Sequence, residues 1–547
     1  MSSAAFDGLS EETLRKLLEI NPDSATALGL HDPYDFKLPD GGKRRFVETM
    51  DLMKAWSKKA RALARSEDLD RDQSTSVKCI DLSLKFLEFQ MKDYPLWKMI
   101  PDPTDPGNLL FIMVSRDYAP YEWRAKAMAS RIEAMPTYME QFRTRFKGSR
   151  VVKVWTEMSI EATEQMPAFL QFIVDSSKGR VDDAILNILK RNVERAEESI
   201  KEQVEWLRSL MDGAVEDFAM GRKAFEKLLR LRGLGMDSDQ ILALGEKYLR
   251  DFKDQRVRLS EKMLPGKGLE AAMHAVQSRA PRTFDDGLKA TADEMEKAKR
   301  YIAEHDIATL DPAAKLHVIE TPAFMAPLLP YAAMFMSSKF DKVQEGIYLV
   351  TRPKDLRNLS KHLNYAAIIN TAVHEAYPGH FHQSVLANHK TWIFQLMSGG
   401  DAMWAGAETV EGWAHYCEKM MFDHGYEATD DAEMEMFNGA IWRACRIIAD
   451  VKLARGEAKV PELVDWMVKE TGMAKDATDA EVKRYSRTPG QALSYMIGRH
   501  LIIGFREEAE KKLGQAFDEK RFHDSVASYG YLPYPLMREA VLAELGA

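Results

Sequence analysis

The sequence predicts a mainly α-helical protein that carries a small β element. Apolar residues recur at spacings of three and four along most of the chain, which is the period of amphipathic helices. Only two short segments, 315–321 and 345–351, have the β-branched and aromatic content of strands. No heptad pattern continues long enough to favour a coiled coil over a helical bundle.

The N-terminal part of the chain predicts successive helices joined by turns. Ser10 has the position of an N-cap for a helix that begins at Glu11. Further helical segments follow, interrupted at residues 95–123 by a stretch with five prolines. Such a stretch predicts a long connection, and connections of this size often shape a pocket. Amphipathic helices then continue to about residue 305.

The composition is that of an ordinary folded protein and argues against a nucleic-acid-binding protein and a membrane-spanning protein. Hydrophobic residues make up 45% of the chain and charged residues 29%. The net charge of −8 and the absence of a basic stripe argue against nucleic-acid binding. No apolar run is long enough to span a membrane, and three cysteines are too few for a disulfide framework. The N-terminus shows no signal-peptide pattern, so we expect a cytoplasmic protein.

The segment 371–383, TAVHEAYPGHFHQ, concentrates residues typical of a zinc site. His374, His380 and His382 can supply imidazole ligands, and Glu375 can serve as a general base. His374 and His380 are six positions apart, and on a regular helix two residues with this spacing diverge. They converge only if the helix is interrupted between them.

Pro378 supplies that interruption. Its ring would collide with the carbonyl of His374 in a regular helix, and Gly379 permits unusual backbone angles. Two local backbone structures are compatible with Pro378 and Gly379. The helix can widen into a bulge that brings His380 back, or it can end at Tyr377 so that His380 approaches from the following turn.

A third ligand is expected from the helical segment AETVEGWAHYCEKMMFDHG. Glu408, Glu411, His415 and Glu418 share one face of this helix. Glu411 or Glu408 can complete a site of two histidines and one glutamate, with the fourth position open for water. His415 or Glu418 can orient a ligand by a hydrogen bond. A solvated helix face without a metal is the alternative.

A C-terminal segment offers groups for the substrate. Tyr495 is the first candidate to stabilise an oxyanion opposite the metal, and Tyr485 is the second. Arg499 lies on the same helix face as Tyr495 and can bind a substrate carboxylate, with Gln491 as a further polar contact. A polar network between buried helices would explain these residues equally well.

The motifs HEAYPGH, EGWAHYCE, PGQALSYMIG and TALGLHDPYDF together resemble the bacterial DUF885 family, which is grouped with the gluzincin zinc metallopeptidases. The resemblance implies that His374, His380 and Glu411 bind Zn²⁺ and that Glu375 is the general base. It also implies a helical gluzincin-like body, with a strand beside the metal helix and two lobes around a cleft. We expect one catalytic unit over 1–547, with lobes 1–305 and 306–547.

The expected function is zinc-dependent hydrolysis of amide bonds in short peptides. One alternative is a zinc hydrolase of a non-peptide amide or a modified amino acid, and the other is a helical binding protein without activity. The sequence leaves substrate length, exo- or endopeptidase action and oligomeric state open. It also leaves open whether His382 or Glu408 replaces one of the ligands.

Overall fold

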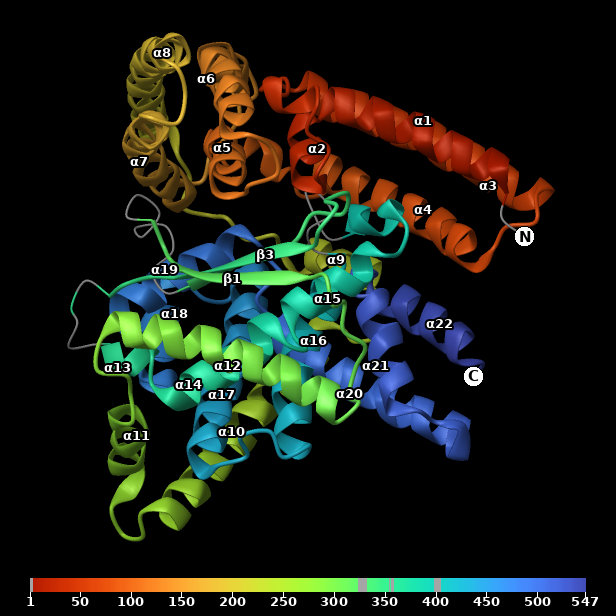
Figure 1. Cartoon of the computed structure of the whole chain (residues 1–547), viewed down its shortest axis with the longest axis vertical. Helices are drawn as coiled ribbons and strands as arrows, with labels where there is room; N and C mark the ends of the chain where they lie inside the picture. The colour runs from red at the N-terminus through yellow and green to blue at the C-terminus, as the bar shows by residue number, and fades with distance from the viewer. Residues whose placement is uncertain (1–2, 323–331, 354, 356–358, 398–404) are drawn as a thin grey trace. The chain divides into compact units, whose positions relative to one another are not determined.

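The computed structural model describes residues 3–322, 332–353, 355, 359–397 and 405–547. These residues form helices and one small three-stranded sheet, so the predicted mainly α-helical class with a small β element is confirmed (Figure 1). No helix in the described residues is both long and apolar enough to cross a membrane.

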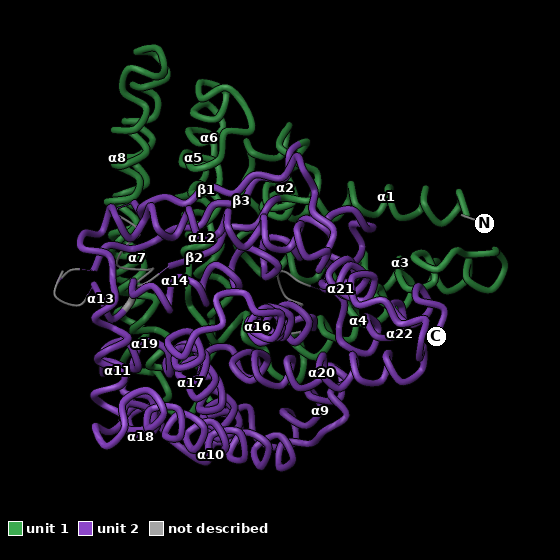
Figure 2. Tube along the Cα trace, turned by 60° about the horizontal axis from the view of Figure 1, so that its bottom comes forward, with its two compact units in different colours: residues 1–218, 323–328, 338–342 green, residues 219–322, 329–337, 343–547 purple. Residues whose placement is uncertain are grey.

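The chain forms two compact units (Figure 2). Among the described residues, unit 1 holds the chain up to Phe218 together with 338–342, and unit 2 holds the remainder. The division after residue 218 differs from the predicted lobe boundary near 305. It lies earlier because α10 (Ser238–Met263) packs along α17 (Asp430–Arg455) within unit 2.

Unit 1 is helical, and its long helices pack in pairs, with α6 and α7 both against α8. Its helices are α1 (Ala4–Ile20), α2 (Pro22–Leu28), α3 (Arg44–Ser66), α4 (Arg71–Lys92), α5 (Asp105–Ser115), α6 (Tyr121–Thr144), α7 (Lys153–Ser177) and α8 (Asp183–Ser209).

Two local expectations for unit 1 are wrong. Helix α1 is capped by Ser3, whose side chain accepts a hydrogen bond from the amide of Phe6. Ser10 lies inside the helix and donates to the Phe6 carbonyl at 2.9 Å, because burial of Phe6 extends the helix towards the N-terminus. The proline-rich stretch 95–123 also contains helix α5, since Pro106 occupies the first turn, where its missing N–H costs nothing.

Unit 2 contains all residues of the predicted metal site. Besides α10 and α17, its helices are α9 (Arg222–Arg232), α11 (Gly268–Ser278), α12 (Phe284–Glu304), α13 (Leu359–His362), α14 (Tyr365–Thr371), α15 (His380–Asn388), α16 (Ala407–Asp423), α18 (Val460–Thr471), α19 (Lys475–Arg487), α20 (Ser494–Leu513), α21 (Glu519–Ser528) and α22 (Tyr534–Leu545).

The sheet has strand order β1-β3-β2. The two strands expected from the sequence are present as β1 (Lys315–Glu320) and β3 (Glu345–Val350), which pair in parallel. The third strand, β2 (Ala332–Phe335), pairs antiparallel with β3 and was not predicted. Gly346 of β3 lies so close to α15 that a Cβ there would be 2.5 Å from the Phe381 ring. The sheet is therefore packed directly against the helix that begins at His380.

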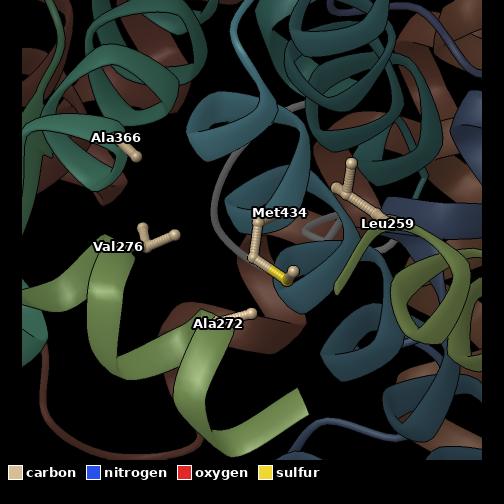
Figure 3. Close-up of a cluster of buried hydrophobic side chains, with 5 residues drawn as sticks. All are labelled: Leu259, Ala272, Val276, Ala366 and Met434. Atoms are coloured by element: carbon tan, nitrogen blue, oxygen red, sulfur yellow. The ribbon is translucent and has the colours of Figure 1, made fainter. Parts of the chain in front are cut away.

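A buried apolar cluster supports the helix that leads into the metal motif. Leu259 of α10, Ala272 and Val276 of α11, Ala366 of α14 and Met434 of α17 gather in it (Figure 3). Because these side chains come from four helices, burying them fixes α14 against the bundle. The metal motif therefore follows a helix that packing holds in place.

Candidate metal centre

The backbone between the two motif histidines combines both predicted local structures. Helix α14 continues into a π-helical turn, η5 (Ala372–Ala376), and Tyr377 then adopts an extended conformation. The amide of Tyr377 donates to the Ala372 carbonyl, and the amide of Gly379 donates to the Val373 carbonyl at 3.0 Å. The Tyr377–Pro378 peptide is cis, and α15 begins at His380. The helix both widens and ends before the second histidine.

This break brings His374 and His380 together with Glu411 of α16. The two imidazole rings are nearly perpendicular, with centroids 4.8 Å apart. His380 Nε2 lies 3.2 Å from Glu411 Oε2. One ligand atom from each of the three residues lies within 4.8 Å of the others. Two imidazoles and one carboxylate at this spacing match the donor set of a catalytic zinc site.

A buried carboxylate oxygen favours a cation between these residues. Apart from its 3.2 Å contact with His380 Nε2, Glu411 Oε2 has no hydrogen-bond partner among the described residues. Buried polar atoms are normally satisfied, and a bound cation would satisfy the carboxylate oxygen. Burial alone would raise the pKa of Glu411, but His380 and then His374 lower that pKa to about 2. Glu411 is therefore ionised at neutral pH, as a ligand must be.

A buried acid orients His374. Its Nδ1 lies 2.7 Å from Glu418 Oε1, and Arg443 Nη2 donates to the same oxygen at 3.1 Å. Burial opposes ionisation of Glu418, but Arg443, His415 and His374 hold its pKa well below the ordinary value. An ionised Glu418 accepts the proton of Nδ1 and leaves Nε2 of His374 to face the cluster. Glu418 is one of the two orienting partners proposed from the sequence.

The two alternative ligands lie outside the cluster. Nε2 of His382 is 2.7 Å from the Thr309 carbonyl, to which it donates. Glu408 is buried in an ion pair with Arg232. The group of three that could hold a metal consists of His374, His380 and Glu411, without His382 or Glu408.

The two candidate tyrosines differ in their surroundings. The hydroxyl of Tyr485 donates to Glu481 at 2.6 Å and accepts from Arg446 at 2.8 Å, and its side chain is fully buried. Tyr495 lies beside the metal cluster, where burial and then the Glu411 carboxylate raise the pKa of its hydroxyl. Tyr495 is therefore better placed than Tyr485 to contact a reacting group.

The two polar residues expected to bind substrate have different positions. Arg499 lies one turn after Tyr495, and its Nη1 donates to Nε2 of the buried His415 at 3.2 Å. It thus joins the network behind Glu418. Gln491 accepts a hydrogen bond from Arg484 at 3.1 Å.

A glycine pair sets the distance between α16 and α20. A Cβ on Gly412 would lie 2.3 Å from the backbone of Gly498, and a Cβ on Gly498 would lie 2.1 Å from the Glu408 carbonyl. The two helices therefore approach at backbone contact. This approach places Tyr495 of α20 next to Glu411 of α16.

Several residues around the site were not predicted from the sequence. Tyr348 of β3 is buried, and burial together with Glu375 raises its pKa well above the ordinary value, which places β3 beside the candidate base. Arg443 and Arg446 lie one helical turn apart on α17, a spacing that indicates a shared face. Nothing in the sequence connects them to Arg484, because only the packing of α17 against α19 brings them together.

Comparisons with known proteins give the family and the fold. A family model described as "Bacterial protein of unknown function (DUF885)" matches residues 22–541. Among curated proteins, none matches this sequence. A "putative lipoprotein of unknown function" from Shewanella oneidensis has a similar solved structure, with 21% identity, a TM-score of 0.78, and coverage of 99% of this chain and 100% of that one.

A second solved structure, a "putative lipoprotein" from Colwellia psychrerythraea, has 16% identity, a TM-score of 0.82 and 99% coverage of both chains. At these identities the likeness shows a shared fold. A Pyrococcus furiosus carboxypeptidase matches with 13% identity over 98% of this chain and 92% of that one, but its TM-score of 0.38 is too low to support an argument. The expected cytoplasmic location has no support from any of these proteins.

Proposed function

This chain belongs to the DUF885 family of bacterial proteins of unknown function, and we propose that it is a zinc-dependent hydrolase of amide bonds in short peptides. One observation carries the proposal. His374, His380 and Glu411 offer ligand atoms within 4.8 Å of one another, although the histidines are six positions apart and the glutamate comes from another helix. Glu375 follows the first ligand directly, in the position of the general base in the gluzincins that the motif resembles.

In the proposed mechanism, several residues of unit 2 have separate roles. Bound zinc would act as a Lewis acid towards the scissile carbonyl and would lower the pKa of water. Glu375 accepts the proton of the attacking water and passes it to the leaving amine. Tyr495 donates a hydrogen bond to the developing oxyanion. Glu418 fixes the tautomer and the orientation of His374.

The proposal is tested by metal content and hydrolysis measured on the same preparation. We expect protein purified without chelators to contain about one zinc ion per chain, and His374→Ala to contain none. A panel of short peptides and acylated amino acids would distinguish peptide hydrolysis from hydrolysis of other amides. A zinc-free preparation that also fails to bind added zinc would overturn the assignment.

The general base is tested separately from the metal. Glu375→Gln should retain zinc and lose roughly 100- to 10,000-fold in kcat, because an amide cannot accept the proton. Glu270→Gln, on the exposed first turn of α11, is a matched control that should change neither property. Ordinary activity in Glu375→Gln would exclude Glu375 as the base.

A further inference from the structure

Two arginines beside the metal cluster share one carboxylate. Arg446 of α17 donates to Glu481 Oε2 at 2.9 Å, and Arg484 of α19 donates to the same oxygen at 2.9 Å. Tyr485 also donates to this oxygen, at 2.6 Å. Glu481 therefore holds both guanidinium groups in fixed positions next to each other.

The positive charge of this pair exceeds the negative charge that faces it. Across the described part of the chain, Glu481 is the carboxylate within ion-pair distance of Arg446, and also the one within that distance of Arg484. The neighbouring Arg443 pairs with a different acid, Glu418. Two guanidinium groups against one carboxylate leave about one uncompensated positive charge, which favours an anionic ligand.

The pair is also accessible and close to the proposed reaction centre. The Arg484 side chain is 37% exposed, whereas that of Arg446 is 5% exposed. Tyr495 connects the pair to the metal cluster: its ring centroid is 4.4 Å from Arg446 Cζ, and its hydroxyl is close enough to Glu411 for that carboxylate, after burial, to raise its pKa. One tyrosine side chain therefore links Arg446 of the pair to Glu411 of the metal cluster.

We propose that Arg484, held in place by Glu481 and Arg446, binds the free α-carboxylate of the substrate, so that the protein acts on short peptides or acylated amino acids whose C-terminal carboxylate lies close to the scissile bond. Arg484 makes the direct contact, since planar guanidinium groups bind carboxylates with paired hydrogen bonds. Arg446 keeps Glu481 and Tyr485 in place beneath it. This assignment rests on the proposed amidase function. It gives the carboxylate to Arg484 in place of Arg499, which belongs to the network of His415 and Glu418.

The first test compares one peptide with and without the charge. Acetyl-trialanine should be hydrolysed with a kcat/KM roughly 10- to 100-fold higher than that of its C-terminal amide, the range expected for a charge-assisted contact. Arg484→Gln should lower kcat/KM for the free acid by a similar factor and leave the amide nearly unchanged. Arg484→Lys should retain part of the preference, because lysine keeps the charge without the paired donors.

Arg506→Gln provides the matched control. Arg506 lies on α20, pairs with Glu519 at 2.8 Å and is 32% exposed, so this variant loses the same charge and a comparable ion pair away from the site. It should retain the full preference for the free acid. Equal rates on the acid and the amide in the wild-type protein, or an unchanged preference in Arg484→Gln, would overturn the carboxylate site.

A binding measurement separates this inference from the proposed function. The same two peptides are titrated into zinc-loaded Glu375→Gln by calorimetry, with and without Arg484→Gln. Tighter binding of the acid that disappears with Arg484→Gln supports the carboxylate site even if the wild-type protein hydrolyses neither peptide. Equal binding of acid and amide rejects the site even if both peptides are hydrolysed. Circular dichroism and zinc content establish that each variant is folded.

Discussion

The backbone of Gly379 lies directly against the carbonyl of His374. A Cβ at position 379 would be 1.8 Å from the His374 oxygen and 2.4 Å from the Val373 oxygen, closer than any side chain permits. The Gly379 amide donates to the same Val373 carbonyl. This contact folds the chain back after the π-helical turn, so that His380 faces His374 across the candidate metal site.

Gly379→Ala should therefore abolish zinc binding. The added methyl group meets backbone atoms that cannot move away, so the turn must open and separate the two histidines. Zinc content and thermal unfolding would measure this effect. Gly504→Ala, within α20 and with nothing within 4 Å of the added carbon, is the matched control and should retain zinc. Normal zinc content in Gly379→Ala would show that the turn does not position the ligands.

Glu418→Gln should weaken zinc binding by about 10- to 100-fold. The amide can still accept the Nδ1 proton of His374, but it carries no charge to increase the basicity of the ring or to balance Arg443. Competition with a chromogenic chelator would measure the affinity. Glu375→Gln, one residue from His374 but assigned to proton transfer, serves as the comparison and should bind zinc normally. Equal affinity in both variants would remove Glu418 from the metal centre.

The break at Pro378 was predictable because its cause is local. A proline four residues after His374 cannot continue the helix, and this holds without knowledge of the rest of the fold. Strands β1 and β3 were predictable from their β-branched residues. Strand β2 was not, because its AAMF sequence has no such signal and it forms by pairing with β3.

The Arg446–Arg484 pair, in contrast, could not be predicted from the sequence. The two arginines lie on different helices, and their shared partner Glu481 precedes Arg484 by three residues, a spacing that also fits an ordinary surface ion pair. The N-cap of α1 could not be predicted from the sequence either. Ser3 and Ser10 both fit an N-cap, and the burial of Phe6 decides between them.

Tyr495→Phe should lower the rate of catalysis, whereas Tyr485→Phe should lower the stability of the protein. Loss of the Tyr495 hydroxyl should lower kcat by about 100- to 1000-fold and leave stability nearly unchanged, because this group is assigned to the oxyanion. Loss of the Tyr485 hydroxyl should cost about 1–3 kcal/mol of stability, because Glu481 and Arg446 lose a buried partner. Kinetics and urea unfolding of both variants measure the two effects. A reversed pattern would assign the catalytic role to Tyr485.

Because of Glu481, the stability of the protein should decrease as the pH falls below about 4.5. Burial raises the pKa of this carboxyl, but Arg446 and Arg484 outweigh burial and lower the pKa to about 2, below the ordinary 4.5. A carboxyl with a lowered folded-state pKa stabilises the fold fully above pH 4.5, and this contribution is lost as the pH falls from 4.5 towards 2. The contribution is on the order of 3 kcal/mol at neutral pH.

Glu481→Gln removes this dependence. The difference in free energy of unfolding between the wild-type protein and Glu481→Gln should be largest at pH 7 and should shrink steadily by pH 3. Urea unfolding at several pH values measures it, with a chelator present throughout so that loss of zinc in acid does not contribute. A difference that stays constant between pH 7 and pH 3 would mean that the two arginines do not hold Glu481 in its ionised form.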